Sequence, residues 1–198
     1  MKKSLSFVWA YALVMLCLVS TSCSNQQAER TYDTSMQYAI DIYNQGVEYT
    51  NAQEHEKAVE CYRIAAEYYG LDQAQFNLGR AYYNGDGVEQ DFTKAATLYY
   101  QAAQQGHPEG QFAIALCYLS EIGVAQDNER FIYWCQQAAD QGFADAQIFM
   151  SVCYLTGFEV EPSISESFLL FCKAIRQGDI VKRLKNVGTA FMLVLIYK

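Results

Sequence analysis

Proline and histidine are both scarce in this sequence. Each occurs twice in 198 residues, and lysine and arginine form no long run. Because 52% of the residues are hydrophobic, the composition predicts one folded or repetitive domain and is atypical of a disordered chain. The net charge of −8, without a basic cluster, argues against nucleic acid and anionic membrane surfaces as partners.

Candidate catalytic and metal-binding side chains are also scarce. The two histidines, His55 and His107, lie in separate segments, so a catalytic triad or a multi-histidine metal site lacks its components. Acids such as Asp86, Glu89 and Asp91 are scattered, and we interpret them as solvent-exposed. We therefore expect no catalytic residues, no metal and no cofactor, and we predict that the chain is not an enzyme.

The N-terminus has the layout of a secretory signal. Lys2 and Lys3 precede the apolar run Leu5–Val19, and small polar residues then lead to Cys23. The apolar run is shorter than the ~20 residues that a membrane-spanning helix needs. This layout predicts an exported chain.

The stretch VSTSC resembles a bacterial lipoprotein signal, with Ser20 where that signal usually has an aliphatic residue. The resemblance implies a signal peptide over residues 1–23, a lipid on Cys23 and a polar tether over residues 24–36. The lipid alone would anchor the protein in the cell envelope, in the periplasm or at the outer membrane. Two alternatives remain open, a cleaved soluble protein and an uncleaved anchor.

The rest of the chain repeats with a period of 36 residues. The period relates Gly70, Gly106, Gly142 and Gly178, and the last three follow the similar stretches AAQQ, AADQ and AIRQ. A small residue comes nine positions after each of the first three glycines and a tyrosine three positions later: Gly79, Ala115 and Ser151, then Tyr82, Tyr118 and Tyr154.

Each repeat predicts two helices. In the second helix, Ala95, Leu98, Tyr99 and Ala102 lie on one face. The closing glycine ends that helix in a left-handed conformation, and the small residue at the Gly79 position lets the paired helices approach closely. Two antiparallel helices per repeat predict an all-α fold, an α-solenoid of stacked pairs.

The run from Ala74 to Gly106 resembles a Sel1-like repeat, with its Leu-Gly-x-x-Tyr, Gly-x-Gly-Val, Lys-Ala and Ala-Ala-x-x-Gly elements. The next two units match less closely, and the last has FEVEPSISES in place of the turn. Upstream, Tyr43 to Glu67 is similar to the related tetratricopeptide repeat. The predicted boundaries are a tetratricopeptide-like repeat over 37–71, Sel1-like repeats over 72–107 and 108–143, a degenerate one over 144–179, and a C-terminal capping helix over 180–198.

This resemblance implies a superhelix that binds a protein or peptide on its concave face, which the first helix of each pair lines. The residues transferred to the partner-binding surface are Phe76, Arg80, Tyr83, Phe112, Leu116 and Leu119. The same face would include Gln73, Glu109, Ile148, Val152 and Leu155. The alternative is that most of these side chains pack between neighbouring units.

The loop Gly85–Val88 could be a phosphate loop, a calcium loop or a turn. No Lys-Ser/Thr follows its glycines, and its acids lack the spacing of calcium ligands. We therefore interpret it as a turn between helices, with Val88 pointing inward and Asp91 capping the second helix.

Seven cysteines are present, of which Cys61, Cys117, Cys135, Cys153 and Cys172 follow the signal. We expect buried free thiols, and one disulfide remains the alternative. Some Sel1-like relatives, suspected of penicillin binding, have a regular cysteine pair per repeat that is absent here. An envelope enzyme or enzyme inhibitor of that type, and a structural lipoprotein that self-associates through the apolar run 190–197, are the alternative functions.

Overall fold

The computed structural model describes residues 34–177, and the structural statements below refer to this part of the chain. The expected signal peptide with Cys23, most of the tether, the expected capping helix and the apolar run 190–197 lie outside the described residues. The chain divides into two units, residues 1–41 and 42–198. Of the first unit, residues 34–41 are described and are helical.

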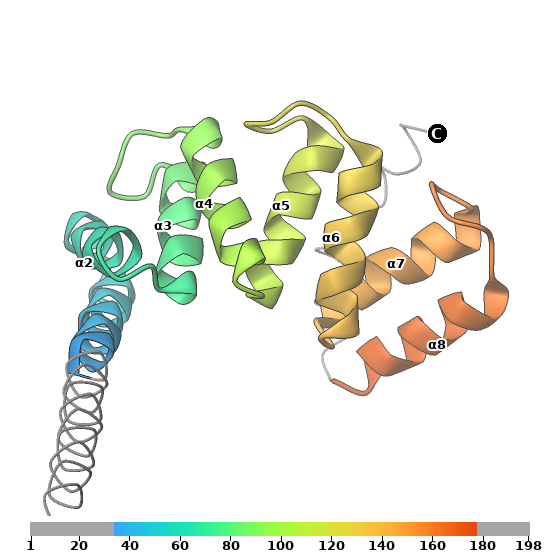
Figure 1. The fold of residues 1–198 in the computed structure, drawn as a ribbon, viewed down its shortest axis with the longest axis horizontal. Coiled ribbons are helices and arrows are strands. Elements are labelled where there is room, and N and C mark those ends of the chain that lie inside the picture. Colours follow the sequence, from blue (N-terminus) through green and yellow to red (C-terminus); the bar gives the residue numbers. More distant parts are fainter. Residues whose placement is uncertain (1–33, 178–198) are drawn as a thin grey trace, which may run out of the picture. The chain divides into compact units, whose positions relative to one another are not determined.

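The second unit is a series of helices that follow one another along the chain (Figure 1). Helical residues 42–51 precede α2 His55–Glu67, α3 Asp72–Asn84, α4 Phe92–Gln104, α5 Pro108–Ser120, α6 Asn128–Asp140, α7 Ala144–Thr156 and α8 Ile164–Ile175. Within each later pair α3 packs on α4, α5 on α6 and α7 on α8, and α4 and α6 also contact the next pair. Residues 34–177 contain no strand, which confirms the all-α repeat fold.

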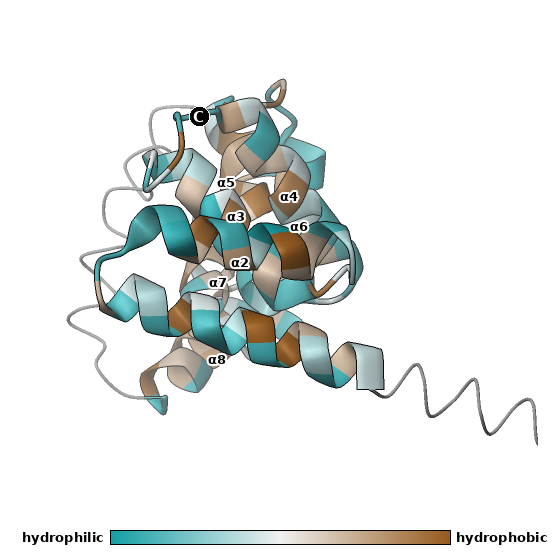
Figure 2. Cartoon of the chain, turned by 90° about the vertical axis from the view of Figure 1, so that its left-hand side faces the viewer, coloured by the Kyte–Doolittle hydropathy of each residue, from teal (hydrophilic) through white to brown (hydrophobic). Residues whose placement is uncertain are grey.

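Most of the helices are amphipathic, as the 36-residue pattern predicts, whereas α5 and α7 are apolar on most sides. Hydrophobic and hydrophilic residues intermingle along each of them (Figure 2), and the buried residues of α4, for example, are Ala95, Ala96, Tyr99, Ala102 and Ala103. Burial of such faces against neighbouring helices supplies most of the stability of short helices. No helix in the described part of the chain is both long and apolar enough for a bilayer crossing.

Polar side chains set the start of each second helix. Asp91, Asp127 and Ser163 precede α4, α6 and α8, and each side-chain oxygen accepts a hydrogen bond from the backbone N–H three residues later, at 2.9, 2.9 and 3.3 Å. The bond from the Lys94 N–H holds the pKa of the Asp91 carboxyl below its ordinary value. Asp91 is therefore an N-cap, as predicted.

Small residues allow the two helices of a pair to approach closely. A Cβ at Gly79 would lie 2.9 Å from the Tyr99 ring and 3.3 Å from the Ala95 carbonyl oxygen. Ala115 and Ser151 hold the same position in the later pairs, and both are buried. The predicted role of this position is confirmed.

The loop Gly85–Val88 is a turn between helices, and Gly87 is the position that most requires glycine. Gly87 has φ +72°, and a Cβ there would lie 2.4 Å from the carbonyl carbon of His55 in the preceding unit. The turn thus presses on the start of α2, and only a residue without a side chain fits.

The last unit forms the same turn although FEVEPSISES does not predict it. Glu159 takes the left-handed conformation of Gly87, with φ 52°, and its Oε1 accepts a hydrogen bond from Asn128 Nδ2 at 3.1 Å. In this unit a side chain bonded to the preceding unit stands where the earlier turns have close backbone contact.

Buried glutamines join each unit to the next. Gln105 Nε2 donates to the carbonyl oxygen of Gly70 at 2.9 Å and to Gln75 Oε1 at 2.8 Å. Gly70 has the predicted left-handed conformation, with φ +67°. The bonds therefore tie the end of α4 to the paired helix α3 and to the end of the preceding unit.

The same arrangement recurs at 36-residue intervals, and we call it the glutamine ladder. Gln141 donates to Gly106 and Gln111 at 2.9 and 2.8 Å, and Gln177 donates to Gly142 and Gln147 at 2.8 and 3.2 Å. Gln111 and Gln147 in turn donate to the carbonyl oxygens of Ala103 and Ala139 at 3.3 and 3.2 Å. The ladder satisfies polar groups that stacking the units would otherwise bury unpaired.

Candidate functional site

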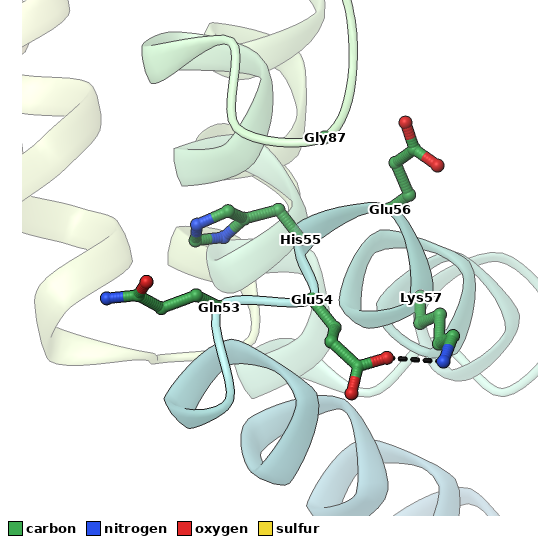
Figure 3. A pocket seen from close by; sticks show the side chains of 6 residues that line it. All are labelled: Gln53, Glu54, His55, Glu56, Lys57 and Gly87. Carbon is green, nitrogen blue, oxygen red and sulfur yellow. Dashed lines mark ion pairs between the residues drawn. The ribbon is translucent and has the colours of Figure 1, made fainter.

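The surface depression beside Gly87 has a volume of about 450 Å³ and is lined by residues 53–57 (Figure 3). Its side chains diverge: in Figure 3 Gln53 and His55 point to one side and Glu56 to the other. Glu54 and Lys57 form an ion pair with each other. A catalytic centre needs polar groups that converge on one point, and this depression does not supply them.

A second depression, of about 430 Å³, lies beside the turn before α4. Two of its charged groups already have local roles, since Asp91 caps α4 and the Lys94 ammonium lies 5.2 Å from the Tyr82 ring centroid. Among residues 34–177, no three histidine, cysteine, aspartate or glutamate side chains gather where they could hold a metal ion.

The predicted partner-binding residues Phe76 and Phe112 lie between successive units. The Phe76 ring contacts Tyr99 of the same pair, with centroids 5.7 Å apart, and stacks on His107 at the start of α5, at 5.1 Å. Phe112 repeats the second contact one unit later, 5.5 Å from Phe143, and it also contacts Phe149 of α7 at 5.7 Å. Both rings are half-buried, so they join units and leave only part of their surface accessible.

Leu119 is fully buried, with 0% of its surface exposed, in the core that runs from α4 to α8. Its assignment to the partner-binding surface is therefore wrong. The physical reason is the composition of α5, which is apolar on most of its circumference and is therefore buried on most of it. Ile148 on α7 is buried in the same way, whereas Leu116 is half-buried.

Arg80 and Tyr83 lie one turn apart on α3. Arg80 is exposed, and Tyr83 is half-buried with its ring edge against Phe92, at 5.4 Å between centroids. Burial raises the pKa of the Tyr43 and Tyr99 hydroxyls, and the positive charge of Arg80 partly opposes that rise at both. Arg80 thus belongs to a surface with several tyrosines.

Arg80 has no ionic partner in residues 34–177, and it shares this with Lys173 and Arg176 at the end of the described chain. Ion pairs link Lys57, Arg63, Lys94 and Arg130 to an acid three residues earlier. At the corresponding position before Arg80 is Asn77. The positive charge of Arg80 is therefore not neutralised by its own helix.

Asn77 is the residue of this surface that the sequence did not single out. Its Nδ2 donates a hydrogen bond to the Tyr43 hydroxyl at 3.1 Å, and both Asn77 and Arg80 line a small cavity of about 40 Å³ with Thr50 and Tyr62. The sequence signal that could have identified this surface is Asn77 itself, which stands where the basic residues with ion pairs have an acid. We call Tyr43, Asn77, Arg80 and Tyr83 the Arg80 surface.

The five cysteines in the described part of the chain are free thiols, as expected. Cys117, Cys135 and Cys153 are buried. Burial raises the pKa of the Cys117 and Cys153 thiols to about 12 and raises that of Cys135 as well. These thiols behave as small apolar side chains and are poor nucleophiles at neutral pH.

The Sel1 repeat family matches residues 36–67, 72–107, 108–143 and 144–179. Over 68 residues the chain is 43% identical to an exopolysaccharide production negative regulator of Rhizobium leguminosarum bv. viciae. This aligned stretch covers 34% of this chain and 25% of that protein. The chain thus spans about a quarter of the length of this curated relative.

Two solved structures are similar in fold. A Sel1 repeat protein from Oxalobacter formigenes superposes with a TM-score of 0.67 and 26% identity, over 75% of this chain and 59% of that one. A protective antigen present in uropathogenic Escherichia coli strains, displaying an SLR fold, superposes with a TM-score of 0.66 and 24% identity, over 78% of this chain and 34% of that one. The second likeness concerns the fold alone.

Proposed function

The chain belongs to the Sel1 repeat family, and from this premise we propose that it is a non-catalytic scaffold that binds a protein or peptide through the Arg80 surface. Sel1 repeat proteins generally mediate protein–protein interactions. Their fold leaves the choice of partner to side chains on the surface of the solenoid. The proposal therefore depends on which side chains remain accessible and unpaired.

The observation that carries the proposal is the unpaired charge of Arg80. Arg80 is exposed, lines a small cavity with Asn77 and Tyr62, and has no acid three residues before it. Arginine and tyrosine dominate the energetics of protein interfaces because they combine large contact area with hydrogen-bonding groups. An acidic group of the partner is the natural complement of Arg80.

The test is a comparison of two charge reversals. The unchanged full chain, used as bait, should capture a partner from an envelope extract. Arg80→Glu should fail to capture the same partner, because the variant places a negative charge opposite the partner's acidic group. Arg63→Glu is the matched control, since Arg63 is also an exposed arginine but lies on α2, paired with Glu60.

Both variants should melt within a few degrees of the unchanged chain, because exposed charges contribute little to stability. Retention of the same proteins by Arg80→Glu and by the control would refute the Arg80 surface. A large loss of thermal stability in Arg80→Glu alone would instead assign Arg80 to the fold.

We also propose that the chain is exported and held in the cell envelope by a lipid on Cys23. The proposal is supported by Lys2 and Lys3, the apolar run Leu5–Val19 and the VSTSC stretch. Cys23→Ser should shift the protein from the membrane fraction to the soluble fraction. Two results together would contradict the proposal. Cys23→Ser would remain in the membrane fraction in unchanged amount, and the N-terminal peptide of the unchanged chain would show no added lipid mass.

A further inference from the structure

The last helix of the described chain, α8, has an apolar stripe beside its buried face, which Ser167, Leu170 and Ala174 form. Ile164, Phe168, Phe171 and Ile175 are spaced by four, three and four residues, so they lie on one side of α8. Phe168 is 68% exposed, Ile175 is 42% exposed, and Phe171 is half-buried. We call these four residues the end face.

In every earlier unit the position of the stripe that corresponds to Ile175 is buried. The counterparts of Ile175 are Ala66, Ala103 and Ala139, which are between 1% and 5% exposed. At the second of these, Gln111 of the following helix bonds to the Ala103 carbonyl oxygen. The end face is therefore the surface that a following unit would bury.

A further unit of the ordinary kind does not fit this surface. The contact is close in the earlier junctions, where a Cβ at Gly110 would lie 2.9 Å from the Ala102 Cβ. The residue 72 positions after Gly110 is Lys182, and Ile175 replaces the small alanine of the earlier units. Both changes enlarge side chains where the standard junction has no room.

We propose that the end face is covered by the chain's own segment 190–197, AFMLVLIY. This segment consists of eight consecutive apolar or aromatic residues, which match an apolar surface. The 12 residues of 178–189 can span about 40 Å when extended, whereas α8 is about 18 Å long. The segment can therefore reach any part of the end face, and it acts as the terminal cap that a repeat array requires.

A second copy of the chain is the other candidate occupant. A segment joined to the surface by a short stretch of its own chain has an effective concentration on the order of millimolar. A second copy at micromolar concentration competes poorly against it for the same surface. Coverage within one chain is therefore favoured.

The experiment uses trypsin and the full chain. Lys182, Arg183 and Lys185 precede the apolar segment and are the cleavage sites that report its release. Phe168→Gln with Ile175→Gln should raise the cleavage rate at these sites at least about tenfold, because it removes the apolar face that holds the segment. Leu155→Gln with Leu169→Gln is the matched control, since both leucines are exposed and lie outside the end face.

Cleavage after Arg130 reports the integrity of the repeat body and should stay slow in both variants. Equal cleavage of the C-terminal sites in the two variants would overturn the proposal.

Should the glutamine variant lose its fold, a chain that ends at Thr189 provides the second measurement. Its α8 amides should exchange with deuterium about tenfold faster than those of the full chain, with α4 unchanged, and unchanged exchange in α8 would overturn the proposal.

Dilution separates the two occupants. Protection of the C-terminal sites should be the same at about 1 µM and about 100 µM chain, because coverage within one chain does not depend on concentration. Protection that is lost on dilution together with a dimer, measured by sedimentation, would identify a second copy as the occupant and overturn coverage by the chain's own segment.

Discussion

Replacement of Gln111 by alanine tests the glutamine ladder. Gln111 is 5% exposed, donates to the Ala103 carbonyl oxygen at 3.3 Å and accepts from Gln141 Nε2 at 2.8 Å. Each buried hydrogen bond contributes about 0.5–1.5 kcal/mol net. The substitution removes two bonds and leaves the Ala103 carbonyl oxygen without its side-chain donor, so it should lower the free energy of unfolding by about 1–3 kcal/mol.

The partner variant Gln141→Ala should cost less, about 1 kcal/mol, because Gln141 is exposed and water can replace its bonds. In a double-mutant cycle the two substitutions should couple by about 0.5–1.5 kcal/mol through the bond they share. Gln137→Ala is the matched control on α6, since Gln137 is exposed and lies outside the ladder.

Urea unfolding followed by circular dichroism measures the free energy of unfolding of the unchanged chain, the two single variants, the double variant and the control. A loss below about 0.5 kcal/mol for Gln111→Ala, with no coupling to Gln141, would show that packing alone holds the units together. The reasoning about the ladder would then be wrong.

Gly87→Ala should destabilise the fold by more than about 2 kcal/mol in urea unfolding, because its Cβ would meet the His55 backbone. Glu121→Gly should stabilise the fold by about 0.5–1 kcal/mol, because Glu121 has φ 56°, a left-handed conformation that glycine adopts more easily. The same change in stability for Gly87→Ala and Glu121→Gly would contradict the turn geometry. Cys117 has a pKa of about 12, raised by burial from 9.0. Its contribution to stability is full below pH ~9 and falls as the pH rises towards 12. Cys117→Ala should flatten this decline in unfolding measured against pH, and an unchanged slope would refute it.

The helix pairs could be predicted from the sequence because their signals are local. Asp91 precedes the first turn of α4 and caps it, and Gly79 faces Tyr99 of the paired helix. Such signals depend on residues a few positions apart or on the 36-residue period. For the same reason, the turn at Gly85–Val88 could be separated from a phosphate or calcium loop.

The accessible surface could be predicted only in part. Arg80 is exposed as expected, but Leu119 is buried, and Asn77 was not singled out. Repeat positions specify which face of a helix a residue occupies, whereas exposure also depends on what packs over that face. For α5, which is apolar on most sides, the repeat position alone does not decide exposure.

The sequence by itself determined the family, the helix pairs and the small residues between them, because each rests on a short pattern repeated at one period. Only the tertiary structure decided that Gln105, Gln141 and Gln177 join the units and that Glu159 can replace a turn glycine. These features depend on side chains about 30 or more residues apart meeting in space. Such meetings follow from how the units stack and are absent from any local pattern.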